Sequence, residues 1–439
     1  MILVLLRHYA SFNKLVYSLR VVPHQKHSSA LHNFDTAIQD CVESSLNCYF
    51  SESEWTLATL STRMGGLGLR STELHSPAAY LASQVACHEL CSQLDENFIW
   101  DPNNDQTDTF TALTEFNHRV KPDKQIQSFS EPNPRQQDLS KAIDELTLST
   151  LKDSKINDKH YQAHLNLISA SGAGSWLHAV PSRSLSTHVD PLLFKTMIQR
   201  RLRVPIFEPN TFCPFCDDTI DLYGDHCLTC SCGGDRTKRH NLLRNEAYYI
   251  CNSAGLNPEL EKPGLLQPRP LGGASQENGS NRENNEQRRP ADVFIPRWRR
   301  GTPAALDFAV TSGLRVDLVN KSAENGSAAT EAYEHLKCSY LNTEESCRAD
   351  GITFIPVICE ANGGGWGPAA HKVWSELGKT KAMLTGEQSS SIANRFLQSL
   401  GLIVHRENAR AVLRRLQKDV EQDFRDLLTA SVISNTNSI

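Results

Sequence analysis

The stretch RPADVFIPRWRRGTPAALDFAV, residues 289–310, sets the fold class of this chain, because its two apolar runs predict adjacent strands. The runs are DVFI and LDFAV, and the basic segment PRWRRGTP forms the turn between them. Strand periodicity places Asp307 on the side of the second strand opposite to its apolar neighbours. A hairpin of this kind can bring Asp292 and Asp307 to the same edge of a sheet.

Two converging carboxylates can hold a hard divalent cation such as magnesium, which polarises a phosphodiester and lowers the pKa of an attacking water. Arg297, Arg299 and Arg300 in the turn would then contact backbone phosphates. The alternative interpretation is that Asp292 and Asp307 are an ordinary strand-edge residue and an ordinary turn residue.

Upstream of the hairpin, two close pairs of Cys and His residues predict a small zinc knuckle. The four predicted ligands are Cys213, Cys216, His226 and Cys230. Two such pairs in one short segment can close a tetrahedral site, and a closed four-ligand site is structural rather than catalytic. Cys227 and Cys232 lie nearby, so the ligand assignment could slip by a few positions, and we prefer Cys230 to Cys232.

The same segment contains FCDD, residues 215–218, which matches the aromatic-x-Asp-Asp pattern of polymerase metal sites. We interpret these two aspartates as a solvated turn, because Cys216 already belongs to the predicted zinc site. A polymerase also requires a third acid on a separate strand.

Helical spacing of apolar residues predicts a helix over 239–254, packed on something apolar through Leu243, Ala247 and Ile250. Glu259 and Glu261 follow it. Residues 352–358 predict a buried third strand, and Glu360 and a glycine cluster follow, where a tight turn is the favoured interpretation.

The rest of the chain predicts mainly helices. Residues 32–46, 138–167, 190–204 and 392–430 have helical spacing, and Ser76-Pro77 is expected to cap a further helix. The segment 190–204 carries a basic patch, from which Arg200, Arg201 and Arg203 are expected to contact nucleic acid. Residues 100–140 are polar and predict a linker, and residues 267–288 predict a disordered insertion.

Composition sets few limits on function. The chain has 439 residues, 39% of them hydrophobic, and a net charge of −5, so nucleic-acid contact requires local basic patches. No signal peptide or membrane span is predicted, which favours the nucleus or cytoplasm and metal-binding rather than disulfide-bonded cysteines. The sequence suggests neither a small-molecule substrate nor an oligomeric state.

The motifs, taken in order, resemble the C-terminal end of non-LTR retrotransposon polyproteins that carry a restriction-enzyme-like endonuclease of the PD-(D/E)xK type. The resemblance rests on the zinc knuckle, the Arg239-His240-Asn241 helix, the Arg-Pro-x-Asp strand and the Leu-Asp strand. In addition, STRMGGLGLR, residues 61–70, resembles the segment that follows the reverse-transcriptase palm, in the thumb. The chain is therefore expected to be part of a longer polyprotein and to lack the polymerase palm.

The resemblance implies an α+β fold with a helical N-terminal region, a zinc knuckle and a small mixed-sheet restriction-endonuclease-like core. The expected regions are a thumb-like remnant (1–99), a linker with helices and a basic patch (100–205), the knuckle (206–235), the endonuclease domain (236–385) and C-terminal helices (386–439).

Residue by residue, Asp292 matches the first acid of the endonuclease motif and Asp307 matches the second. The usual lysine two positions later is replaced by Ala309, so the resemblance assigns its role to Lys337, because the retrotransposon branch displaces this lysine to a following helix. Glu261 or Glu259 would be the upstream acid. The extra Ala291 inside the Pro-Asp pair departs from the pattern.

These assignments imply a DNA endonuclease with structural zinc and catalytic magnesium, which nicks target DNA to prime reverse transcription of the element RNA. Two alternatives remain open. One is an inactive remnant that only binds nucleic acid, and the other is a host protein whose knuckle mediates protein contacts.

Overall fold

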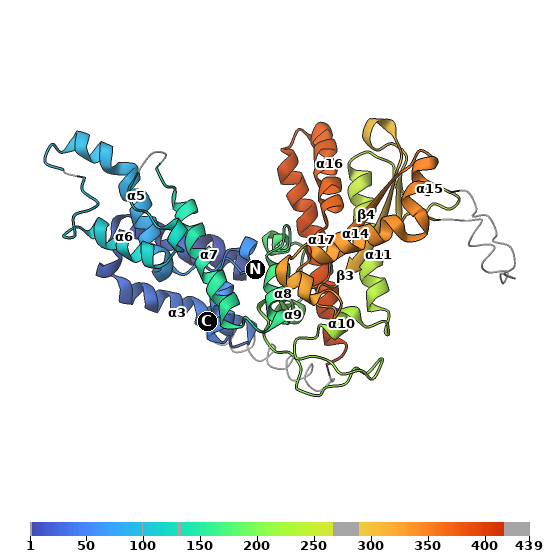
Figure 1. Cartoon of the computed structure of the whole chain (residues 1–439), viewed down its shortest axis with the longest axis horizontal. Helices are drawn as coiled ribbons and strands as arrows, with labels where there is room; N and C mark the ends of the chain where they lie inside the picture. The colour runs from blue at the N-terminus through green and yellow to red at the C-terminus, as the bar shows by residue number, and fades with distance from the viewer. Residues whose placement is uncertain (1, 99, 130–132, 267–288, 417–439) are drawn as a thin grey trace, which may run out of the picture.

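The computed structural model describes residues 2–98, 100–129, 133–266 and 289–416. The chain is mostly helical with one small mixed sheet, so the predicted α+β class is confirmed. Figure 1 shows a helical part containing α3, α5, α6 and α7 on the left and a part containing the strands on the right, with α8 and α9 between them. The predicted insertion 267–288 lies outside the described residues, and so does the end of the chain after 416.

The N-terminal half is built from helices and short turns of helix. They are α1 (Ile2–Leu5), η1 (Leu6–Ala10), α2 (Phe12–Val21), η2 (His24–Lys26), α3 (Ser28–Leu46), α4 (Glu52–Thr59), η3 (Thr62–Met64), α5 (Thr72–Leu94), α6 (Asp108–His118), η4 (Pro122–Lys124), α7 (Gln136–Ser154), α8 (Lys159–Ile168), η5 (Ser175–His178) and α9 (Pro191–Leu202). The helices predicted over 32–46, 138–167 and 190–204 are therefore confirmed.

The predicted cap at Ser76-Pro77 is wrong, because both residues lie inside α5 and are buried. The helix begins at Thr72, and the Ser71 hydroxyl accepts a hydrogen bond from the Leu74 amide. A proline inside a helix leaves the carbonyl four residues earlier without its usual partner. Here that carbonyl belongs to Glu73, and it accepts hydrogen bonds from Arg119 and from the Ser76 hydroxyl.

The predicted linker over 100–140 is also wrong in part, because it contains α6 and the start of α7. Ala112, Leu113 and Phe116 of α6 are buried against Leu81 of α5 and Ile143 of α7. Tertiary burial of this apolar stripe stabilises a helix whose sequence is otherwise polar.

The sheet has four strands in the order β1 (Glu259–Leu260), β2 (Val293–Ile295), β3 (Ala304–Thr311) and β4 (Thr353–Glu360). The first three are antiparallel neighbours, and β4 is parallel to β3. A parallel pair requires a crossover, which contains α13 (Val319–Glu324), α14 (Ala328–Ser339), η7 (Tyr340–Asn342) and α15 (Thr343–Ala349). The hairpin, the third strand and the helix carrying Lys337 are therefore confirmed, and η6 (Arg299–Gly301) lies in the hairpin turn.

Helices cover both faces of the sheet. Leu306 and Phe308 of β3 pack with α11 (Asp235–Ser253), α16 (Pro368–Thr385) and α17 (Ser389–Leu413) on one face. On the other face, Ala305 of β3 and Phe354 of β4 pack with Cys347 of α15. Burial on both faces explains the almost continuous apolar sequence of β3 and β4.

Helix α17 joins the two parts of the molecule. It packs against α16 and α11 in the sheet-containing part, and against α9 and η5 in the helical part. It also contacts α10 (His226–Thr229) in the segment between them. None of the described helices combines the length and apolar composition that a membrane crossing requires.

Candidate metal centre and acidic row

The structure brings the four predicted zinc ligands together. One donor atom from each of Cys213, Cys216, His226 and Cys230 lies within 4.8 Å of the others, and the group could hold a metal ion such as zinc. Within the part of the chain that the structure describes, no other group of three or more Cys, His, Asp or Glu donors gathers in this way. Of the spare cysteines, Cys227 is buried in the apolar core.

Two turns position these ligands. The Asp217 amide donates to the Cys213 carbonyl over 2.9 Å, with Asp217 in the left-handed region at φ 61°, which curls the first Cys pair. The Asp221 carboxylate accepts from the His226 amide over 2.8 Å at the start of α10. The Cys230 amide then donates to the His226 carbonyl over 2.9 Å, so one helical turn spaces the second pair.

The electrostatics of the cluster fit a cation. Burial opposes ionisation of the Cys213 thiol, but hydrogen bonds from the Phe215 backbone and the Arg415 guanidinium lower its pKa to about 6. A backbone hydrogen bond from Asp218 favours the Cys216 thiolate, yet burial and the neighbouring thiols raise its pKa to about 12. Thiols this close therefore ionise together only around a positive charge.

The Cys-rich segment, residues 206–235, is anchored on the end of α17. Ala411 and Val412 of α17 pack against Phe207 and Leu228 of the segment. The guanidinium carbon of Arg415 lies 4.8 Å from the centre of the Phe215 ring, and its nitrogens donate to the Asp235 carboxylate and the Cys232 carbonyl. The metal centre is therefore in direct contact with Arg415, two residues after the end of α17.

Three acids form a line across neighbouring strands, which we call the acidic row: Glu261, Asp292 and Asp307. The Glu261 amide donates to the Asp292 carbonyl, and the Asp292 amide donates to the Leu306 carbonyl, both over 2.9 Å. Val293 pairs with Leu306 in the antiparallel register, so Asp292 stands opposite Asp307. The hairpin thus places these two predicted acids at facing positions.

Asp292 lies directly before the first residue of β2, beside the part of β3 that extends past β2. Its Oδ2 accepts a 2.7 Å hydrogen bond from the Phe308 amide, in place of a ladder bond. His240 Nε2 on α11 lies 3.2 Å from the same oxygen and 3.1 Å from the Phe308 carbonyl. Both neighbours of this nitrogen are acceptors, so it carries a proton, and the hydrogen bond to Asp292 raises the pKa of His240.

Asp307 meets the predicted lysine directly. Lys337 Nζ lies 2.7 Å from Asp307 Oδ2, and both side chains are largely buried. Burial raises the pKa of Asp307, although the lysine opposes this shift, and the negative charge of Asp292 raises it further. Burial lowers the pKa of Lys337, but Asp307 and Asp292 more than offset that effect and leave it raised. The charges of Asp292, Asp307 and Lys337 are therefore close enough to interact.

The two candidates for an upstream acid differ in position. Glu261 belongs to the acidic row, and its carboxylate pairs with Arg244 of α11 and, at 3.5 Å, with Arg289. Glu259 is exposed and pairs with Lys262 at 2.8 Å. The structure therefore places Glu261 beside Asp292, with its charge already balanced.

The predicted basic patch on α9 is wrong for Arg200, Arg201 and Arg203, which are buried. Arg200 and Arg203 both pair with the Asp225 carboxylate, and Arg201 donates to four backbone carbonyls. Sequence periodicity could not show this, because these partners come from distant segments. These three residues are structural and are not available to bind nucleic acid.

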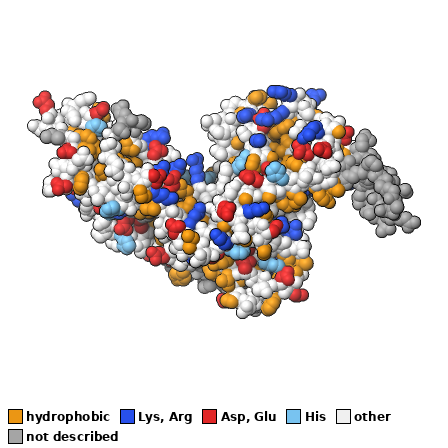
Figure 2. Space-filling view, viewed as in Figure 1, with side chains coloured by type: hydrophobic (Ala, Val, Ile, Leu, Met, Phe, Trp, Pro, Cys, Tyr) orange, Lys and Arg blue, Asp and Glu red, His pale blue; other side chains and the backbone are white. Residues whose placement is uncertain are grey.

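Arg297, Arg299 and Arg300, in contrast, are exposed in the β2–β3 turn. Figure 2 shows Lys and Arg side chains gathered at the upper end of the right-hand part, above α16 and this turn. Arg299 pairs with Glu376 of α16 at 2.6 Å. The turn lies at the opposite end of the hairpin from the acidic row, about 16 Å away at 3.3 Å per residue.

The segment after β4 forms a tight turn around a buried carboxylate, as the favoured interpretation predicted. Glu360 accepts hydrogen bonds from the Gly313 and Gly363 amides and from the Asn362 side chain. The two aspartates of the FCDD motif lie in the turn of the Cys-rich segment.

The predictions gave no role to His240, Arg244 or Arg415, although their side chains contact the candidate ligands. A signal for His240 was present, because it lies three residues before Leu243 and therefore on the packed face of α11. Arg415 could not be found from spacing, because it lies about 200 residues after the cysteine that it contacts.

No protein-family model matches this sequence, and no curated protein matches it. Function must therefore be inferred from the residues and their arrangement.

Proposed function

We propose that this chain is the DNA-binding and DNA-nicking part of a non-LTR retrotransposon polyprotein, with a magnesium site at Asp292 and Asp307. The observation that carries the proposal is the facing position of these two acids, together with the Lys337 ion pair on Asp307. The motif order that resembles such elements supports the same function. Asp292 directly precedes β2, Asp307 lies in β3, and Lys337 lies in α14, which follows β3 in the crossover to β4.

The residues present suit a hard cation. Asp292 and Asp307 offer carboxylate oxygens, which magnesium prefers, and water or phosphate would complete its coordination. When bound, magnesium would polarise the phosphodiester and lower the pKa of an attacking water. Lys337 would neutralise charge that develops on the phosphate, and His240 holds Asp292 in place by a hydrogen bond.

The remaining charged features have separate roles in the proposal. Zinc in the Cys-rich segment would be structural, because its four protein ligands leave no open position for a substrate. The exposed arginines of the β2–β3 turn would contact the DNA backbone beyond the cleavage point. The element RNA is the second expected partner, as it is in polyproteins of this kind.

A plasmid-nicking assay with magnesium tests the proposal. We expect Asp307→Asn and Lys337→Ala to reduce nicking by about a hundredfold or more, because each removes an electrostatic contact to the reacting group. The matched controls are Asp350→Asn and Lys321→Ala, which make the same changes at exposed side chains outside the acidic row. Equal nicking by all five proteins, or none by the wild type, would reject an active nuclease.

One observation favours the alternative of an inactive nucleic-acid-binding remnant. Lys337 already occupies an oxygen of Asp307, and Arg244 and Arg289 balance Glu261. That alternative predicts salt-sensitive DNA binding, weakened by substitution of the turn arginines, without cleavage in any divalent cation.

A further inference from the structure

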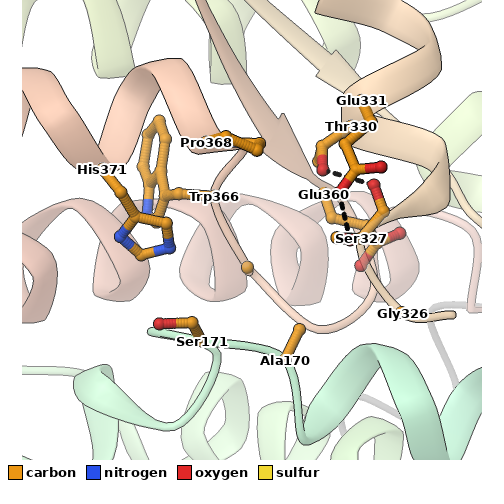
Figure 3. A pocket seen from close by; sticks show the side chains of 11 residues that line it. Ala170, Ser171, Gly326, Ser327, Thr330, Glu331, Glu360, Trp366, Pro368 and His371 are labelled. Carbon is orange, nitrogen blue, oxygen red and sulfur yellow. Dashed lines mark hydrogen bonds between the residues drawn. The ribbon is translucent and has the colours of Figure 1, made fainter.

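A cavity of about 320 Å³ lies beside α14, away from the acidic row. Its wall comes from three separate parts of the chain: the loop after α8, the first turns of α14, and the segment that joins β4 to α16. Figure 3 shows Trp366 and His371 side by side at one end, above Ser171, and Thr330 and Glu331 at the other end. None of the predictions from sequence included this site.

The cavity is at the small end of the range for ligand sites, with a volume of roughly ten water molecules. That volume is large enough for a single heterocycle. Trp366 is 4% exposed and packs edge-to-face on Trp374, with ring centres 5.2 Å apart, which fixes its orientation. The site is therefore built around a rigid aromatic wall.

Two residues that line the same cavity carry buried polar atoms without partners. Trp366 Nε1 and His371 Nε2 have no hydrogen-bond partner among the described residues. Glu331 accepts one hydrogen bond, from the Ser327 hydroxyl, and keeps further acceptor capacity. An indole N–H donor at one end and a carboxylate acceptor at the other require a ligand with both kinds of group.

The charges of the residues that line the cavity indicate which class of ligand it could bind. It includes Glu331 and Glu360 but no lysine or arginine, so it disfavours a phosphate or another anion. The Glu360 carboxylate is fully engaged by its own turn, which leaves Glu331 as the acceptor. A simple cation would satisfy Glu331, but it could not accept from the Trp366 indole. A purine base carries hydrogen-bond donors on one edge and acceptors on another.

We propose that this cavity binds a single unstacked nucleobase of the nucleic-acid substrate, and that guanine fits it best. Guanine presents two adjacent N–H donors on its Watson–Crick edge, which a carboxylate such as Glu331 accepts, and the N7 acceptor on its other edge can accept from a donor such as Trp366. The proposal deepens the proposed function by naming the part of the substrate that is read.

The position of the cavity relative to the acidic row supports this role. Thr330 in the cavity wall and Lys337 on Asp307 are seven residues apart, so they lie on the same face of α14. At 1.5 Å per residue they are about 10 Å apart along the helix axis. This equals about three base steps of a strand at 3.4 Å each, so the cavity would read a base near the nick.

Saturation-transfer NMR with the full chain and each of the four nucleosides tests the proposal without involving phosphate or cleavage. We expect guanosine to bind most tightly. Glu331→Gln should weaken binding about tenfold or more, because it replaces a charged acceptor by a group that also donates. The control Glu324→Gln makes the same charge change at an exposed position outside the lining and should bind as the wild type does.

A second variant, Ala170→Leu, inserts a larger side chain at the wall and should also abolish binding. Its folding is checked by the melting temperature. No nucleoside binding, or binding that neither variant weakens, would overturn the proposal. Spermine binding without nucleoside binding would also overturn it and would indicate a cation site.

The nicking assay separates this proposal from the proposed function. Nicking of DNA by a chain that binds no nucleoside would overturn the base site alone. Guanosine binding by a chain that does not nick would support the base site and reject the nuclease.

Discussion

At the scale of single residues, the Asp307–Lys337 pair decides whether the acidic row can hold a cation. The pair is largely buried, and burial favours the neutral form of the carboxyl group. Lys337 opposes this effect by placing a positive charge 2.7 Å from the carboxylate. The lysine therefore favours the ionised form of Asp307, even though it also occupies one of the carboxylate oxygens.

This balance predicts how cation binding depends on pH. Because the pKa of Asp307 is raised, the carboxylate is protonated, and loses the cation, at a higher pH than an exposed aspartate would. Lys337→Met removes the opposing charge and should raise that pKa further. Calorimetric titration with Mn²⁺ between pH 4 and pH 8 should show the binding lost at higher pH in the variant.

The same Mn²⁺ titration is used for a matched control variant. Lys321→Met removes an exposed lysine and should leave the pH dependence as in the wild type. A shift of the Lys337→Met curve to lower pH would show that the lysine mainly competes with the cation.

At the scale of elements, the Cys-rich segment and the last turn of α17 stabilise each other. The segment has few elements of its own, and its apolar residues are buried against α17. Arg415 donates to the Cys213 sulfur and to Asp235, so it links the ligand cluster to the helix. Metal binding in a segment of this kind contributes directly to folding.

Removal of the metal should therefore loosen both elements. We expect wild-type protein to contain about one zinc ion per chain and Cys216→Ser to contain much less. Hydrogen exchange in EDTA should increase over residues 206–235 and in the last turn of α17, while the sheet stays protected. Cys232→Ser should retain zinc and normal exchange, because Cys232 is outside the ligand group. Equal zinc in both variants would contradict the ligand assignment.

At the scale of the whole molecule, buried Arg201 connects distant segments of the chain. Its guanidinium donates to carbonyls of the glycine-containing loop after α4 and of the segment after α8. The loop fits closely, since a Cβ at Gly66 would lie 2.0 Å from the Leu60 carbonyl oxygen. Arg7 satisfies two more carbonyls of this region, at Leu67 and Leu177. The segment that resembles a polymerase thumb, residues 61–70, is therefore part of a tightly packed junction.

Arg201→Met should therefore destabilise the protein strongly. Four carbonyls would lose their donor, and unsatisfied buried groups cost about 1–3 kcal/mol each, partly recovered where water can enter. We expect the free energy of unfolding in urea to fall by about 3 kcal/mol or more. The control Arg183→Met, at an exposed position, should change it by less than about 0.5 kcal/mol. A similar small change in both variants would show that the junction is not stabilised in this way.

The sequence determined the elements whose signal is local. Apolar periodicity located most of the longer helices and the three main strands, and paired Cys and His spacing located the ligand cluster, because each signal lies within a few residues. The hairpin pattern also indicated Asp292 and Asp307 as candidate site residues, whereas Lys337 became a candidate only through the resemblance.

The tertiary structure decided everything that depends on distant partners. The arginines of α9 are buried, although the local pattern shows only that they are basic. The polar stretch that predicted a linker contains α6, because its apolar residues pack against α5 and α7. The tertiary structure also placed His240 on Asp292, Arg415 on Cys213, and three remote segments around the cavity beside α14. The physical reason is that burial and hydrogen bonding are set by whatever the chain brings near, and one-dimensional spacing does not contain that information.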